Sequence, residues 1–178
     1  MDYSIFIWEI IAFVLISLIS SVIYLYCDYQ DSNNFYKLFI PKNDSLWERV
    51  KVLLAPTILV MLIECLFIDI NSNFMFAKLV SLVVMALVNP LFFILYFRFS
   101  KWDMLVINVL STISSALIGL LISITIISIP MLPDAIIYIS ALGIILILMF
   151  YICATFFQTD DLIFVDPVTK RKNLKKDI

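Results

Sequence analysis

Long apolar stretches separated by short polar segments make up most of this chain. Each stretch reaches the ~20 residues that a helix needs to cross the ~30 Å hydrocarbon core of a bilayer. We expect one helix in each of residues 4–26, 45–70, 74–97, 103–128 and 135–157. The pattern predicts an all-α polytopic membrane protein. Five transmembrane helices would form one domain over residues 1–157, with a basic cytoplasmic tail over 158–178.

Composition agrees with this prediction. Of the 178 residues, 63% are hydrophobic and the mean hydropathy is +1.09, whereas soluble domains contain roughly 45–50% apolar residues. The polar segments are too short to form a separate soluble domain. The first apolar run follows Asp2 and contains Glu9 instead of following a cationic region. We therefore expect a retained helix and not a cleaved signal peptide.

The basic residues predict how the helices are oriented. Of the 12 Lys and Arg residues, all but Lys78 fall within residues 37–51, 98–101 and 170–176. Because short loops rich in Lys and Arg stay on the cytoplasmic side during insertion, these segments belong on one face. Five crossings achieve this, whereas four or six do not. We expect a bacterial plasma membrane protein with its N-terminus outside and its C-terminus in the cytoplasm.

The second predicted helix has a recognisable beginning. Ser45 and Glu48 have the spacing of a capping box, in which each side chain binds a backbone N–H at the start of the helix. We therefore expect this helix to start in water near Ser45.

Three ionisable residues lie inside predicted helices, where a charge costs about 2.5–3.5 kcal/mol near the bilayer centre. They are Glu9, Glu64 and Lys78. Each lies roughly four to six residues inside the outer end of its helix, at a similar depth of ~6–9 Å. Lys78 would then be placed to pair with one or both carboxylates. The group is either a structural ion pair or an outward-facing site for a cation, a proton or a lipid headgroup.

Three further features have two interpretations each. Asn89 precedes Pro90, which frees a carbonyl for a ligand or simply bends the helix. A polar and small stripe in residues 103–128 predicts close helix packing or, alternatively, a conduction pathway; it consists of Asn108, Ser111, Thr112, Ser115, Gly119 and Ser123. The tail binds anionic lipid headgroups or only fixes the orientation; its basic residues are Lys170, Arg171, Lys172, Lys175 and Lys176.

The chain contains no histidine, and its three cysteines have no C-x-x-C spacing. This excludes H-E-x-x-H metal sites, Ser-His-Asp triads and Cys-His pairs. We expect no catalytic residue, no metal, no cofactor and no nucleic-acid partner. The expected partners are the lipid bilayer and another membrane protein or an anionic lipid.

Several segments resemble an uncharacterised family of small bacterial multi-spanning membrane proteins. They are residues 37–51, Ile63-Glu64, Phe76-Ala77-Lys78, Trp8-Glu9 and Asp166-Pro167-Val168-Thr169. Members of that family carry histidines where this chain has Ser21 or its neighbours and Arg49, so no metal role carries over. The resemblance implies a five-helix bundle in a bacterial plasma membrane and brings no established activity.

These observations lead to one expected function and two alternatives. We expect a non-enzymatic binding, immunity or accessory factor that acts through its helix faces and its cytoplasmic loop. The first alternative is a solute or ion carrier that uses Glu9, Glu64 and Lys78. The second is a membrane enzyme acting on lipid substrates, which without histidine would rely on carboxylates or Lys78 for proton transfer.

Overall fold

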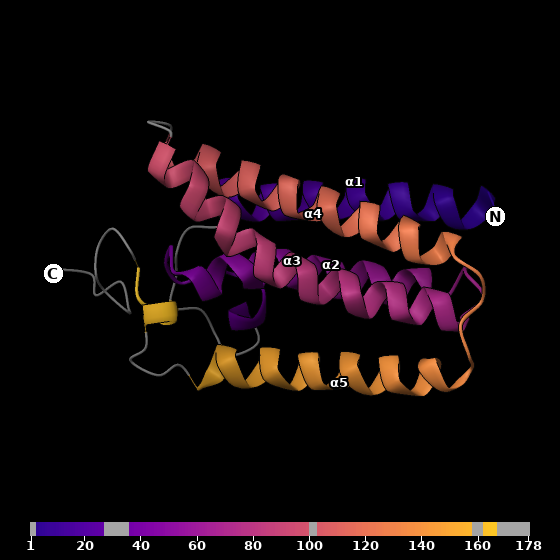
Figure 1. Cartoon of the computed structure of the whole chain (residues 1–178). Coiled ribbons are helices and arrows are strands. Elements are labelled where there is room, and N and C mark those ends of the chain that lie inside the picture. Colours follow the sequence, from indigo (N-terminus) through magenta and orange to yellow (C-terminus); the bar gives the residue numbers. More distant parts are fainter. Residues whose placement is uncertain (1–2, 27–35, 100–102, 158–161, 167–178) are drawn as a thin grey trace, which may run out of the picture.

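Five long helices and two short 3₁₀ helices form the structure, a computed structural model that describes residues 3–26, 36–99, 103–157 and 162–166 (Figure 1). The elements are α1 (Tyr3–Tyr26), η1 (Tyr36–Leu38), α2 (Leu46–Glu64), α3 (Ser72–Phe99), α4 (Met104–Ser128), α5 (Ala135–Phe156) and η2 (Leu162–Phe164). The described residues contain no strand. The predicted all-helical class with five helices is therefore confirmed.

The five long helices lie roughly along one axis, and each runs in the opposite direction to the helix before it in the chain (Figure 1). In Figure 1, α1 and α4 lie along one edge, α2 and α3 occupy the middle, and α5 lies along the opposite edge. The helix contacts agree, because α4 packs against both α1 and α3, and α5 packs against α3. The start of α1 and the 3₁₀ helix η2 lie at opposite ends of the bundle.

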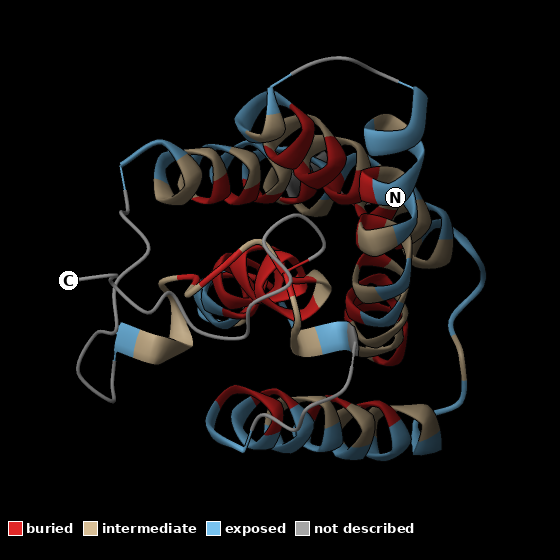
Figure 2. Ribbon diagram, turned by 90° about the vertical axis from the view of Figure 1, so that its left-hand side faces the viewer, coloured by how far each residue is buried: buried red, intermediate tan, exposed pale blue. Residues whose placement is uncertain are grey.

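Helix α2 occupies the centre of the bundle. Fifteen of its 19 residues are buried, and Figure 2 shows it at the centre, with other helices above it, below it and on its right. The four other long helices are long and apolar enough to cross a membrane, whereas α2 is not among those candidates. Composition accounts for this difference, because α2 contains four charged residues, Glu48, Arg49, Lys51 and Glu64.

The expected helix over residues 45–70 is too long at its C-terminal end. Helix α2 ends at Glu64, and the chain turns through hydrogen bonds from the N–H groups of Phe67 and Ile68 to the carbonyl oxygen of Glu64 (3.0 and 2.9 Å). Residues 65–70, which are apolar except for Asp69, lie beyond the end of the helix. The run of apolar residues therefore continues past the end of the helix and does not predict where α2 ends.

Polarity is inverted relative to a water-soluble protein. Large apolar side chains such as Leu87, Leu121 and Leu142 are exposed on α3, α4 and α5. Charged and amide side chains, in contrast, are buried inside; they include Glu9, Glu48, Arg49, Lys51, Glu64, Lys78, Asn89 and Asn108. Lipid solvates such an exterior and water does not, so the fold is that of a membrane protein.

The small stripe of α4 packs against its neighbours as expected. All six of its residues are buried. The Ser81 hydroxyl of α3 donates to the carbonyl oxygen of Gly119 (3.0 Å), and a Cβ at Gly119 would lie 2.0 Å from Cε of Met85. The absence of a side chain at residue 119 therefore allows α3 and α4 to approach each other closely.

Candidate functional site

Three helices bring Glu9, Glu64 and Lys78 together at the end of the bundle where α2 turns into α3. Lys78 Nζ lies 2.7 Å from Glu9 Oε1, 2.7 Å from Glu64 Oε2 and 2.9 Å from Glu64 Oε1. Glu9, Glu64 and Lys78 are 3%, 1% and 7% exposed. We call these three residues the acid–lysine cluster. The antiparallel course of α2 and α3 explains the pairing, because it places residues near the turn side by side.

Two neighbours complete the cluster. Ser123 of α4 donates a hydrogen bond from its hydroxyl to Glu9 Oε1 (2.8 Å). Lys78 Nζ also lies 5.2 Å from the centroid of the Phe74 ring, within the range of a cation–π contact. The lysine therefore bridges two carboxylates and faces an aromatic ring. Its surroundings are formed by residues of α1, α2, α3 and α4.

A small cavity adjoins the acid–lysine cluster. Its volume is about 20 Å³, and it is lined by apolar side chains together with Thr57, Ser81 and Ser123. A space of this size holds about one water molecule. The cluster in this conformation can thus exchange protons or contact one water, but it has no room for a solute.

Asn89 does not join the acid–lysine cluster. It lies eleven residues after Lys78 on α3, which corresponds to ~16 Å along a helix. It is fully buried, and its Nδ2 donates to the Thr112 hydroxyl of α4 (3.4 Å). Its Oδ1 has no hydrogen-bond partner among the described residues.

Asn89 and Thr112 form a pair beside Asp44, Arg49 and Asn108, because Thr112 follows Asn108 by one turn of α4; we call these five residues the amide cluster. Asn108 Nδ2 donates to Asp44 Oδ1 (2.9 Å), and the same oxygen forms an ion pair with Arg49 Nη2 (3.2 Å). Arg49 Nε also donates to the backbone oxygen of Asp44 (2.9 Å). The Arg49 guanidinium carbon lies 3.4 Å from the centroid of the Phe93 ring.

An apolar layer separates the two clusters. It consists of Ala12, Ile16, Leu53, Val60, Met85 and Ala116, which pack together in the interior. Met85 of α3 falls between Lys78 and Asn89, and Ala116 of α4 falls between Thr112 and Ser123. The polar stripe of α4 is therefore not a continuous polar path across the bundle in this conformation.

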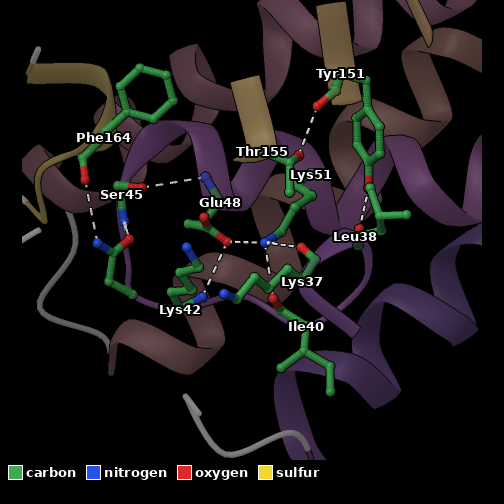
Figure 3. Close-up of polar contacts among 11 residues, drawn as sticks. Lys37, Leu38, Ile40, Lys42, Ser45, Glu48, Lys51, Tyr151, Thr155 and Phe164 are labelled. Atoms are coloured by element: carbon green, nitrogen blue, oxygen red, sulfur yellow. Dashed lines mark hydrogen bonds and ion pairs between the residues drawn. The ribbon is translucent and has the colours of Figure 1, made fainter. Parts of the chain in front are cut away.

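A third polar group surrounds the start of α2 and holds the connecting segments in place (Figure 3). Lys51 Nζ forms an ion pair with Glu48 Oε2 and donates to the carbonyl oxygens of Lys37 and Ile40 (2.9 Å each). The Tyr151 hydroxyl of α5 donates to the carbonyl oxygen of Leu38. These contacts tie η1 to both α2 and α5.

The helix start at Ser45 differs from the expectation in two respects. Only half of the capping box forms: the Glu48 N–H donates to the Ser45 hydroxyl (3.4 Å), but Glu48 Oε2 accepts from the Lys42 N–H (3.1 Å). The Ser45 N–H binds Asn43 Oδ1 instead (3.0 Å). Ser45 is fully buried rather than exposed to water, because η1 and η2 pack over this end of α2.

Sequence reasoning missed the roles of Arg49 and Lys51. It counted both as loop cations that fix the orientation, whereas both are buried and paired with carboxylates. The three-residue spacing of Glu48 and Lys51 was the available signal, because such pairs meet on one face of a helix. The tail residues Lys170, Arg171, Lys172, Lys175 and Lys176 lie outside the described residues.

The described residues contain no group of three His, Cys, Asp or Glu side chains that could hold a metal ion. The fold and its polar interior define the class of protein: an all-helical membrane protein with one central, mostly buried helix. The chain belongs to a family of unknown function (DUF6512), whose family model matches residues 3–174. This confirms the resemblance to an uncharacterised family. No curated protein and no solved structure matches the chain.

Proposed function

We propose that the protein is a multi-pass protein of a bacterial plasma membrane, with its N-terminus outside, that acts as a non-enzymatic binding or accessory factor. Its contacts with a membrane partner would be made by the outer faces of α3 and α5 and by the segment around η1. The observation that carries this proposal is the pairing of interior charges. The buried ionic side chains of α1, α2 and α3 bind one another or Asp44, and no cavity described at the acid–lysine cluster exceeds the size of a water molecule.

Crosslinking from the membrane-facing surface tests this proposal. A photoreactive residue replaces Leu87 of α3 or Leu142 of α5, both exposed, and Leu82, which is 1% exposed, is the matched inward control. We expect both outward positions to give the same discrete protein adduct in native membranes, and the Leu82 position to give none. Adducts with lipid alone at both outward positions would contradict the proposal.

A thiol-labelling experiment separates this function from a solute carrier. In a cysteine-free background, Ser81→Cys places a thiol beside the cavity, and Leu66→Cys places one in the exposed turn after α2. A membrane-impermeant reagent should label residue 66 and leave residue 81 unmodified. Labelling of residue 81 at a comparable rate would favour a carrier, because it requires a water-filled route to the cluster.

A further inference from the structure

We propose that the acid–lysine cluster is a binding site for one proton. Binding converts one of its two carboxylates to a carboxylic acid and changes the charge of the cluster from −1 to zero. This inference does not depend on the proposed binding or accessory function. The cluster would bind this proton whichever partner the protein has.

The acid–lysine cluster carries more negative than positive charge. Two carboxylates, Glu9 and Glu64, surround one ammonium, Lys78, and leave one uncompensated negative charge. Among the described residues, the other cations lie toward the far end of the bundle. Lys51 precedes Glu64 by thirteen residues of the same helix, or ~20 Å, and Arg98 follows Lys78 by twenty, or ~30 Å.

The surroundings make this excess charge unfavourable. All three members of the cluster are more than nine-tenths buried, in a bundle whose outer surface is apolar. An unpaired charge in such a medium costs several kcal/mol, and the group neutralises itself by changing its protonation state. The compensating proton goes to one of the two carboxyl groups that contact Lys78.

The neighbouring groups do not remove the imbalance. The titratable groups that act on Glu64 are Lys78 and Glu9, and Cys65 follows it in the chain. Helix α4 contributes the uncharged hydroxyl of Ser123. Glu64 is also the last residue of α2, where the helix dipole presents its negative end and disfavours a second negative charge.

The adjoining cavity provides a place from which a proton can arrive. It has room for about one water molecule and is lined by Glu9, Glu64 and Lys78. The apolar layer lies on its inner side. Proton exchange therefore takes place at the end of the bundle where α2 turns into α3. Since both carboxyls contact the same Lys78 ammonium, the bound proton belongs to the pair and not to either residue alone.

Infrared spectroscopy of the full chain in lipid vesicles tests the proposal. Wild-type protein should show the C=O stretch of one buried carboxylic acid at neutral pH, and the band should disappear as the pH is raised. Glu64→Gln and Glu9→Gln should each abolish the band, because either change leaves a neutral pair of Lys78 with one carboxylate. Lys78→Met should increase it about twofold, because two buried acids then lack a cation.

Glu48→Gln is the matched control. Glu48 is 1% exposed, but its ion pair with Lys51 is already neutral, so this change should leave the band as in wild type. Absence of the band from wild-type protein at neutral pH would overturn the proposal without reference to any variant. Persistence of the band in Glu9→Gln would also overturn it, because the proton would then not depend on the charge balance.

Discussion

Lys78 of α3 is bound to both carboxylate oxygens of Glu64 of α2, at 2.9 Å from Oε1 and 2.7 Å from Oε2. The two residues are fourteen positions apart, on either side of the turn between antiparallel helices. This contact joins the central helix to the outer helix that follows it. Glu9 brings α1 into the same network through its own 2.7 Å contact with Lys78. The stability of one end of the bundle should therefore depend on the lysine more than on either acid.

Replacing Lys78 should be more damaging than replacing Glu64. Lys78→Met leaves two buried carboxyls without a cation, and we expect it to lower the free energy of unfolding by about 3–5 kcal/mol. Glu64→Gln leaves the pair of Lys78 and Glu9, and we expect a loss of about 1 kcal/mol. Unfolding in detergent or mixed micelles measures both. Equal losses for the two variants would contradict the central role of the lysine.

Lys51 should hold the connecting segment on the end of the bundle. Lys51→Met removes an ion pair and two hydrogen bonds to backbone oxygens of residues 37 and 40, at an expected cost of about 3 kcal/mol. Limited proteolysis should then cleave residues 36–42 faster than in wild type. Lys42→Met is the control, since Lys42 is only half-buried. The idea fails if both variants are cleaved at the same rate.

The amide of Asn89 should contribute little net stability. Its Oδ1 lacks a partner among the described residues, and an unsatisfied buried acceptor costs about 1–3 kcal/mol. The double variant Asn89→Leu with Thr112→Val replaces both members of a weak hydrogen bond by apolar groups of similar shape. We expect its unfolding free energy to equal or exceed that of wild type. A loss above about 2 kcal/mol would show that the amide has a partner that contributes substantially.

Gly119 should be needed for the contact between α3 and α4. Gly119→Ala places a methyl group 2.0 Å from Cε and 2.8 Å from Cγ of Met85, so we expect a loss of about 1–3 kcal/mol from overpacking. Adding Met85→Leu, which shortens the opposing side chain, should recover part of that loss. Thermal unfolding of the single and double variants measures the recovery. No recovery would mean that the strain lies in the backbone and not in the contact with Met85.

Much of the helical architecture could be predicted from the sequence. Apolar runs of sufficient length require helices in lipid, because only hydrogen bonds within the segment can satisfy the backbone there. The stripe of α4 predicted its packed face, and the isolated charges Glu9, Glu64 and Lys78 marked positions that need partners. Asn89 also stood out, but its depth along α3 places it with Thr112, away from the lysine.

By itself, the sequence determined where helices form and that Glu9, Glu64 and Lys78 need partners, because the periodicity and the cost of a charge in lipid are local properties. The tertiary structure alone decided that α2 is central, that Arg49 and Lys51 are internal, and that one lysine meets two acids. These outcomes depend on which helices become neighbours. An apolar helix satisfies its backbone equally well beside lipid and beside protein, so its own residues do not specify its position in the bundle.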